Sequence, residues 1–132
     1  MLPNTDIEVR KSRIHGRGVF ALRDFKPGEV VLMWDTSYAL TDDEYAKLPD
    51  DQKQYATRYR GGWILMQEPM RYVNHSCDAN TASQEGTDVA TKPIRAGEEI
   101  TSDYRPEMKK GERMKCRCRT ESCEGFIVGT GL

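Results

Sequence analysis

The sequence predicts a mainly β domain with little regular helix. Apolar and polar residues alternate in residues 7 to 10, which is the two-residue period of a half-buried strand. Short apolar runs follow in residues 19 to 22 and 30 to 34, and a turn sequence in residues 24 to 28 separates them. Because runs of this length between turns suit strands, a small β meander is expected at this end of the chain.

Length and composition limit the classes of protein to consider. A chain of 132 residues is large enough to form one domain with its own core. The 20 basic and 21 acidic residues leave a net charge of -1, so no direct contact with nucleic acid and no attraction to a membrane surface are expected. No signal peptide or membrane-spanning apolar run is evident, which favours an intracellular location, cytoplasmic or nuclear. No pattern indicates an oligomeric state.

Residues 41 to 60 have a helical character. A capping-box sequence begins at Thr41, and apolar side chains then recur three or four residues apart. With a break near Pro49, two short helices are expected, the second reaching Tyr59. The acidic side chains of this segment either form a solvated helical face or attract a basic peptide. They are Asp42, Asp43, Glu44, Asp50 and Asp51.

The second half of the chain returns to β patterns around a polar stretch. Residues 61 to 66 predict a turn and a buried strand, and residues 87 to 104 predict strands with a turn at residues 95 to 98. Between them, residues 71 to 80 contain a Tyr, two Asn, a His and a Cys. Taken alone, this stretch is equally compatible with a turn whose polar side chains bond to the backbone, with Cys77 buried.

Other stretches resolve the ambiguity. Four blocks follow one another along the chain. The first is Ile14-His15-Gly16-Arg17-Gly18-Val19-Phe20-Ala21 and the second is Arg71-Tyr72-Val73-Asn74-His75-Ser76-Cys77. The third is Ile94-Arg95-Ala96-Gly97-Glu98-Glu99-Ile100-Thr101-Ser102-Asp103-Tyr104, and a group of cysteines is the last. In this order the blocks resemble the SET-domain protein lysine methyltransferases with a post-SET zinc tail, from about Ile7 to Phe126. The resemblance implies a SET-domain (β-clip) fold of small sheets with a pseudoknot, comprising a SET domain in residues 1–105, a helical insert in about 41–60 and a zinc-binding post-SET segment in 106–132.

The resemblance also implies a binding site for S-adenosylmethionine and its product S-adenosylhomocysteine. Glycines let a backbone approach such a ligand closely, and amide and imidazole groups can hydrogen-bond it. Without the resemblance, the glycines would read as a plain turn and the histidine as structural. The residues expected to bind the cofactor are Gly16, Arg17, Gly18, Arg71, Asn74, His75, Tyr104 and Phe126.

Tyr104 is the expected catalytic residue, since the tyrosine that ends the matching motif lies beside the transferred methyl group and the amine in the family. The alternative is a core tyrosine with a satisfied hydroxyl. Two departures concern the substrate channel. Ser102 stands where relatives often have Phe or Tyr, and its small side chain favours multiple methylation. Trp34 or Tyr38 stands near the position of a channel tyrosine.

The cysteines indicate a metal site. Cys116, Cys118 and Cys123 have the C-x-C-x4-C spacing of ligands on a tight loop, and a structural Zn²⁺ site takes four ligands. The resemblance makes Cys77 the fourth ligand. Free buried thiols are the alternative interpretation.

The expected function follows from the resemblance. It is the transfer of a methyl group from S-adenosylmethionine to a lysine side chain of a protein or peptide, with a histone tail as one candidate substrate. The rival interpretation is a catalytically inactive, zinc-stabilised peptide-binding module with the same SET-like fold.

Overall fold

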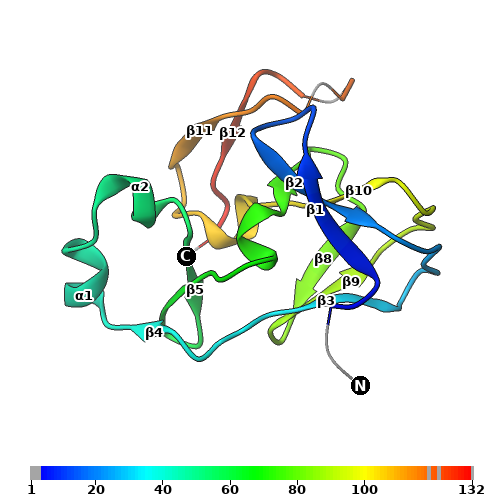
Figure 1. Cartoon of the computed structure of the whole chain (residues 1–132). Helices are drawn as coiled ribbons and strands as arrows, with labels where there is room; N and C mark the ends of the chain where they lie inside the picture. Colours follow the sequence, from blue (N-terminus) through cyan, green and yellow to red (C-terminus); the bar gives the residue numbers. More distant parts are fainter. Residues whose placement is uncertain (1–3, 119, 122, 132) are drawn as a thin grey trace.

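The computed structural model describes residues 4 to 118, 120 to 121 and 123 to 131, and the mainly β prediction is confirmed (Figure 1). The strands are β1 (Ile7–Lys11), β2 (Arg17–Ala21), β3 (Val30–Met33), β4 (Ala39–Leu40), β5 (Ala56–Tyr59), β6 (Gly62–Leu65), β7 (Asn74–His75), β8 (Thr81–Gln84), β9 (Thr87–Ala90), β10 (Glu99–Ser102), β11 (Arg113–Lys115) and β12 (Phe126–Val128). The helices are α1 (Asp42–Ala46) and α2 (Asp50–Lys53), and the single 3-10 turns are η1 (Met70–Tyr72) and η2 (Arg105–Glu107).

One sheet holds most of the chain together. Its strands follow the order β1-β2-β10-β8-β9-β3, and β7 pairs with β10 beside this path. β10 is antiparallel to β2 but parallel to β7 and β8. The segment that leads to Tyr104 is therefore joined both to the glycine-containing strand near the N-terminus and to the strand that carries Asn74 and His75. This is the crossing of segments that the predicted pseudoknot requires.

Two turns with the same spacing pair with each other and form a repeat that the sequence does not reveal. Phe25 and Ile94 exchange backbone hydrogen bonds of 2.8 and 3.0 Å. A glycine follows three residues later in each segment, Gly28 and Gly97, and both have φ of 91°, which a side chain would disfavour. When residues 21 to 31 are aligned with residues 90 to 100, only the alanine at the start, this glycine and the glutamate after it are identical. The sequence similarity is therefore too slight to reveal the repeat.

The insert begins as predicted and then departs from the prediction. Thr41 accepts a hydrogen bond from the Glu44 N–H and donates its own N–H to the Glu44 carboxylate, so the capping box is confirmed. The expectation that the second helix reaches Tyr59 is wrong, because α2 ends at Lys53 and β5 follows. Arg60 and Gly61 have φ of 50° and 79°, and positive φ at both central positions makes the two-residue turn of a β-hairpin. This turn pairs β5 with β6.

The apolar core fixes the strands that carry the polar residues of interest. Val19, Leu32, Ile94 and Ile100 are almost completely buried, and burying a large aliphatic side chain contributes about 1.5 to 3 kcal/mol each. Asn74 and His75 are buried as well, although they are polar. Their hydrogen-bonding groups must therefore find partners inside the protein.

The tail after Arg105 forms a sheet of its own from β11 and β12. Backbone hydrogen bonds tie it to the rest of the chain, including one of 2.9 Å from the Thr130 N–H to the Arg105 carbonyl. The division into a SET domain and a post-SET segment near residue 105 stays a prediction. Within the described residues, no helix has the length and apolar character needed to cross a bilayer.

Candidate active site

A cavity of about 510 Å³, here called the large cavity, lies where β7, the loop of residues 12 to 17 and the tail meet. Among the described residues, its wall carries the basic side chains of Arg17, Arg71, Lys115 and Arg117 and no acidic one. The lining residues are Ile14, His15, Gly16, Arg17, Gln54, Tyr55, Arg71, Tyr72, Asn74, His75, Tyr104, Met114, Lys115, Cys116 and Arg117. Such a wall suits a ligand with an anionic group.

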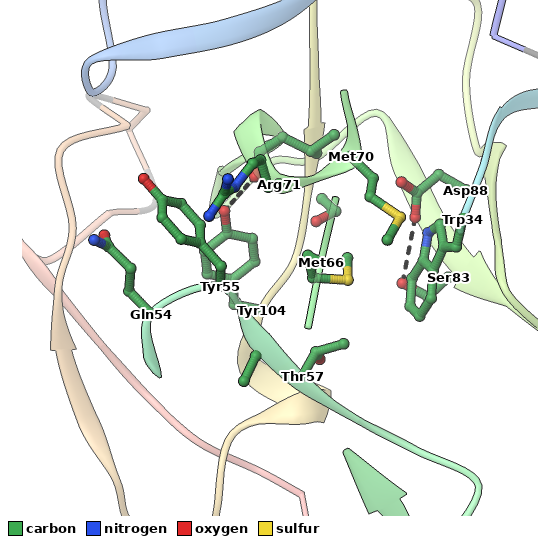
Figure 2. Close-up of a pocket in the computed structure, with 13 residues that line it drawn as sticks. Trp34, Gln54, Tyr55, Thr57, Met66, Met70, Arg71, Ser83, Asp88 and Tyr104 are labelled. Atoms are coloured by element: carbon green, nitrogen blue, oxygen red, sulfur yellow. Dashed lines mark hydrogen bonds between the residues drawn. The ribbon is translucent and has the colours of Figure 1, made fainter. Parts of the chain in front are cut away.

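A second cavity of about 90 Å³, here called the small cavity, also has Tyr104 in its lining. Figure 2 shows Tyr55, Arg71 and Tyr104 together at one end and Trp34, Ser83 and Asp88 at the other, with Met66 between them. Its lining residues are Trp34, Gln54, Tyr55, Ala56, Thr57, Met66, Met70, Arg71, Val73, Ser83, Asp88, Ser102 and Tyr104. Gln54, Tyr55, Arg71 and Tyr104 line both cavities, so the two spaces meet at these side chains.

Tyr104 is held at two points. Its hydroxyl donates a hydrogen bond to the backbone carbonyl of Val73, and its backbone N–H donates to Nδ1 of His75 over 3.0 Å. The hydroxyl proton is used within the protein, so the lone pairs of the oxygen are what the hydroxyl can offer to a ligand. The tyrosine is thus positioned as a hydrogen-bond acceptor between the two cavities.

His75 acts as a neutral hydrogen-bonding group. Burial lowers its pKa, while Asp103, whose Oδ1 lies 3.7 Å from Nδ1, raises it and Arg105 lowers it further. Because Nδ1 accepts from Tyr104, the ring proton belongs on Nε2. Nε2 lies 3.5 Å from Sγ of Cys77, so this imidazole connects Tyr104 to the cysteine group. Asp103 is itself held by Arg105 through two side-chain contacts of 2.8 Å.

Asn74 uses its amide nitrogen to hold the loop of residues 12 to 17. Nδ2 lies 2.9 Å from the Arg17 carbonyl, 3.1 Å from the His15 carbonyl and 2.9 Å from Oε2 of Glu99. An amide nitrogen has only two protons, so protein acceptors occupy both. Direct contact of Asn74 with a ligand is left to the amide oxygen or to the backbone.

Arg71 packs its guanidinium on the ring of Tyr55, with Cζ 3.9 Å from the ring centroid. Its Nε is buried and has no hydrogen-bond partner within the described residues. The same holds for Nε1 of Trp34. Both side chains line the small cavity. Buried N–H groups without a partner are uncommon in proteins, so these two donors indicate that a polar group belongs in this cavity.

The structure brings most of the predicted site residues together, but three lie elsewhere. Gly16, Arg17, Arg71, Asn74, His75 and Tyr104 line the large cavity, and Trp34 and Ser102 line the small one. Gly18 is buried and lines neither cavity. Tyr38 is 52% exposed and Phe126 is 37% exposed, and neither is among the lining residues. Their roles in binding stay predictions.

Several lining residues carry no signal in the sequence. Tyr55 and Gln54 enter from the insert, whose pattern predicts only a helix, and Met66 and Met70 read as ordinary core residues. Asp88 lies in β9 and is 3% exposed. It accepts a hydrogen bond of 3.4 Å from Ser83. Its burial follows from the β9 register, since Asp88 pairs with Leu32 of β3, and the alternation of a β strand could have suggested an inward position.

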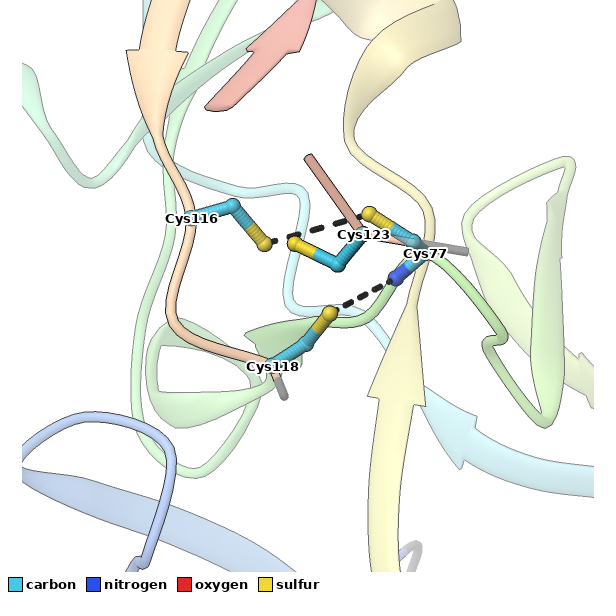
Figure 3. Close-up of side chains that lie close together, drawn as sticks. All are labelled: Cys77, Cys116, Cys118 and Cys123. Atoms are coloured by element: carbon cyan, nitrogen blue, oxygen red, sulfur yellow. Dashed lines mark hydrogen bonds between the residues drawn. The ribbon is translucent and has the colours of Figure 1, made fainter. Parts of the chain in front are cut away.

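The four cysteines converge although Cys77 is far from the others in sequence (Figure 3). Their sulfur atoms all lie within 4.8 Å of one another, and the Cys77 and Cys116 sulfurs are 3.9 Å apart. A tetrahedral Zn²⁺ site with Zn–S bonds of about 2.3 Å has sulfur–sulfur edges of about 3.8 Å. All four cysteines are free of disulfides. The donor set and its spacing therefore fit a structural zinc ion.

Three of the cysteines have shifted pKa values. Burial and the neighbouring cysteines raise the pKa of Cys77 far above its ordinary value, and burial raises the pKa of Cys116 to about 11. For Cys118, burial opposes ionisation, yet the Cys77 N–H and the Thr120 hydroxyl lower the pKa to about 6. The Cys118 thiolate is thus favoured, whereas those of Cys77 and Cys116 are not, and a divalent cation beside them would favour their ionisation.

The cysteine group also shapes the large cavity. Cys116 lines it together with Met114, Lys115 and Arg117, and β11 is held in place by its pairing with β12. The tail is therefore one wall of the large cavity. A metal ion that binds Cys77 to the three tail cysteines would fix this wall against β7.

The fold is a β domain in which two cavities share Tyr104 as a lining residue, next to a group of four cysteines that fits a zinc ion. The sequence model described as SET domain matches residues 16–105. The chain belongs to the SET-domain family.

The curated relatives are histone-lysine N-methyltransferases. SET9 of Gibberella zeae is 41% identical over 123 residues, which are 86% of this chain and 18% of that protein. SET9 of Yarrowia lipolytica is 37% identical over 121 residues, 89% of this chain and 14% of that protein. Set2 of Drosophila melanogaster is 39% identical over 67 residues, 45% of this chain and 3% of that protein. The chain thus spans less than a fifth of the length of each of these relatives.

Solved structures support the fold assignment. A histone methyltransferase candidate from Plasmodium falciparum superposes with a TM-score of 0.63 and 21% identity over 75% of this chain and 92% of that chain. The ctPRC2 structure in an autoinhibited conformation bound to S-adenosylmethionine gives a TM-score of 0.67 and 23% identity, over 79% of this chain and 16% of that chain. At this level of identity the likeness concerns the fold.

Proposed function

We propose that the protein methylates a lysine side chain of a protein substrate and uses S-adenosylmethionine as the methyl donor. The observation that carries this proposal is the meeting of the large and small cavities at Tyr104. A methyl transfer needs a donor site and an acceptor site that open onto the same point. The family and the names of the relatives agree with this reaction.

The large cavity has the size and the chemistry for the cofactor. Its volume of about 510 Å³ falls within the range of about 300 to 1,000 Å³ that small-molecule sites occupy. Its cationic wall suits the carboxylate of the amino-acid end, with Arg71 and Arg17 as candidate partners. Gly16 has φ of 45°, and a Cβ at this position would meet no atom within 4 Å, so its backbone is open to a ligand. When bound, S-adenosylmethionine supplies an electrophilic methyl group and is converted to S-adenosylhomocysteine.

The small cavity suits one extended side chain. At about 90 Å³ it is too small for a whole cofactor. The thioethers of Met66 and Met70 and the ring of Trp34 give it apolar wall sections, beside the polar side chains of Arg71, Ser83 and Asp88. The amine of a free lysine has a pKa of about 10.4, and desolvation by such walls lowers it. The amine can therefore lose its proton to water before the transfer, without a dedicated base.

Tyr104 would orient the reacting groups. Its hydroxyl is fixed by the Val73 carbonyl, so its lone pairs point in a defined direction and can accept from the lysine amine or make a weak C–H contact with the methyl group. Fixed acceptors of this kind cost no rearrangement during the reaction. Trp34 and Ser102 would complete the channel wall. Ser102 is 9% exposed, and its small side chain leaves room for an amine that already carries methyl groups.

Zinc would hold the tail as the outer wall of the cofactor site. Cys77, Cys116, Cys118 and Cys123 are the four ligands that we propose, and the histidine Nε2–H next to the Cys77 sulfur would donate to the resulting thiolate. Unpaired cysteines of this kind persist in reducing compartments, which supports an intracellular location. A histone tail is the substrate that the relatives' names favour.

Transfer of labelled methyl from S-adenosylmethionine to histones and other basic proteins tests the proposal. Wild type should label a lysine. Tyr104→Phe should keep cofactor binding and lose about 10²- to 10³-fold in turnover, the usual cost of one oriented polar group in an active site. Tyr45→Phe is the control, because Tyr45 stacks on Trp63 with ring centroids 3.8 Å apart in the insert, away from both cavities.

The rival function is a peptide-binding module without turnover. It would be favoured if the zinc-loaded protein binds S-adenosylmethionine and basic peptides but transfers no label to any of them. Full activity of Tyr104→Phe would instead remove the role of this tyrosine while leaving the methyltransferase assignment in place.

A further inference from the structure

Glu99 lies at the centre of the hydrogen bonds that shape the loop of residues 12 to 17. Its two carboxylate oxygens are 2.8 and 2.9 Å from the hydroxyl of Ser12. Oε2 is also 2.9 Å from Nδ2 of Asn74. Glu99 belongs to β10, Ser12 follows β1 and Asn74 begins β7. One carboxylate therefore joins three segments that are far apart in the sequence.

The same network reaches the backbone that lines the large cavity. The Asn74 amide nitrogen shares its two protons among the Glu99 carboxylate and the carbonyls of His15 and Arg17. The Ser12 hydroxyl accepts a hydrogen bond of 2.9 Å from the Ile14 N–H, and the Ser12 N–H donates to the Gly16 carbonyl over 2.8 Å. These contacts close the loop upon itself, so its conformation depends on the two side chains that Glu99 holds.

Gly18 owes its identity to this carboxylate. A Cβ at Gly18 would lie 2.3 Å from Oε2 and 2.8 Å from Cδ of Glu99, so an alanine there would push the end of the Glu99 side chain away from its hydrogen-bond partners. Gly18 is buried and does not line the large cavity. The second glycine of the Gly16-Arg17-Gly18 motif therefore leaves space for the Glu99 carboxylate.

We infer that Glu99 is a positioning residue, which holds the loop of residues 12 to 17 in its binding conformation through Ser12 and Asn74 and requires a glycine at position 18. This inference rests on the proposed binding of S-adenosylmethionine in the large cavity. A carboxylate accepts hydrogen bonds and donates none, which matches the two donors that face it. A glutamine would turn an NH₂ donor toward one of them.

The first experiment measures the loop without any cofactor. Glu99→Gln should accelerate amide hydrogen exchange at Ser12 and Ile14 by about tenfold or more, since hydrogen bonds to charged groups are the stronger ones. Glu98→Gln is the matched control, because Glu98 is the exposed residue directly before β10. Equal exchange in Glu99→Gln and wild type would overturn the inference, whatever the cofactor does.

The second experiment measures S-adenosylmethionine binding by calorimetry, and methyl transfer where activity exists. Glu99→Gln should raise Kd and KM for the cofactor by about tenfold and leave kcat at saturating cofactor close to wild type. A purely structural role predicts a lower Tm with an unchanged Kd, which would overturn the inference. Should Glu99→Gln fold poorly, Ser12→Ala removes one of the two donors and should shift Kd in the same direction.

A double-mutant cycle tests the role of Gly18. Gly18→Ala alone should weaken cofactor binding about as much as Glu99→Ala, but it should add little in the Glu99→Ala background, where the clash is gone. An undiminished loss in that background would show that Gly18 meets the cofactor itself. A wild-type protein that binds no S-adenosylmethionine would contradict the proposed function, and the exchange experiment would still decide the role of Glu99.

Discussion

Nδ1 of His75 accepts a hydrogen bond of 3.0 Å from the backbone N–H of Tyr104, and this contact joins the metal-type site to the tyrosine between the cavities. The opposite ring nitrogen faces the Cys77 sulfur at 3.5 Å. Since His75 is 5% exposed, neither contact can be replaced by bulk water. The imidazole is thus a rigid spacer between two functional elements, and it needs no change of protonation state for that task.

Replacing His75 by alanine should destabilise the protein by about 1 to 3 kcal/mol, because the Tyr104 N–H would lose the hydrogen bond that Nδ1 of His75 accepts. The free energy of unfolding in denaturant measures this loss. His15→Ala is the control, since His15 is exposed and is the other of the two histidines. A loss of equal size in both variants would contradict the structural role of His75. Zinc content should also fall in His75→Ala, because the donor next to Cys77 is removed.

Removal of zinc should abolish cofactor binding before it unfolds the β core. The tail carries few buried apolar side chains, Cys116 and Ile127 among them, whereas the large sheet has a core of its own. Without metal, the four cysteines no longer bind the tail to β7, and the tail should detach from that strand. Metal analysis should find one zinc per chain, and a chelator should eliminate calorimetric binding of S-adenosylmethionine while the far-ultraviolet circular dichroism of the strands persists.

A Cys123→Ser variant provides the matched comparison. It leaves three thiol ligands and should reproduce the chelated state without any added reagent. A chelated protein that still binds the cofactor with wild-type affinity would separate the tail from the large cavity and contradict the arrangement described above.

The sequence predicts the elements that local patterns encode and misses those that depend on pairing partners. The capping box at Thr41 and the glycine turns at Gly28 and Gly97 act within four residues, so they can be read directly. β7 and β8 exist because β10 lies between distant segments, and β5 exists because the turn at Arg60 and Gly61 brings it back onto β6. The local alternation of apolar and polar residues does not predict strands of this kind.

The candidate site divides in the same way. Tyr104, Asn74 and His75 belong to sequence motifs whose order along the chain allows them to be predicted. Tyr55 reaches the site from an insert whose sequence pattern predicts only a helix. Glu99 is present in the sequence motif, yet its partners Ser12 and Gly18 lie more than 80 positions away. Its role becomes apparent only when β10 is seen beside β2.

Ser102 should control how many methyl groups the lysine accepts. Its side chain is buried at the small cavity, whose volume of about 90 Å³ a phenylalanine at this position would reduce. Ser102→Phe should therefore shift the product toward monomethyllysine, as measured by mass spectrometry of a peptide substrate at several time points. Ser102→Ala, which adds no bulk, should keep the wild-type distribution. A product pattern that is the same in all three proteins would place the limit on methylation elsewhere in the cavity.

Asp50 and Asp51 should raise the rate on basic peptides at low ionic strength. Both are in the first turn of α2, which has no buried residue, and Gln54, one position beyond the helix, lines both cavities. Their charge thus lies near the path of an incoming substrate, where it can steer a cationic peptide.

Changing both Asp50 and Asp51 to lysine should lower kcat/KM about tenfold at low salt, and the difference should shrink as salt screens the charges. The control reverses Glu85 and Glu98, which are exposed and belong to turns on other parts of the chain, so that the net charge changes equally. If both double variants lose the same rate, overall charge and not this helix governs the encounter. If neither loses rate, the acidic side chains of the insert are a solvated face without a part in substrate binding.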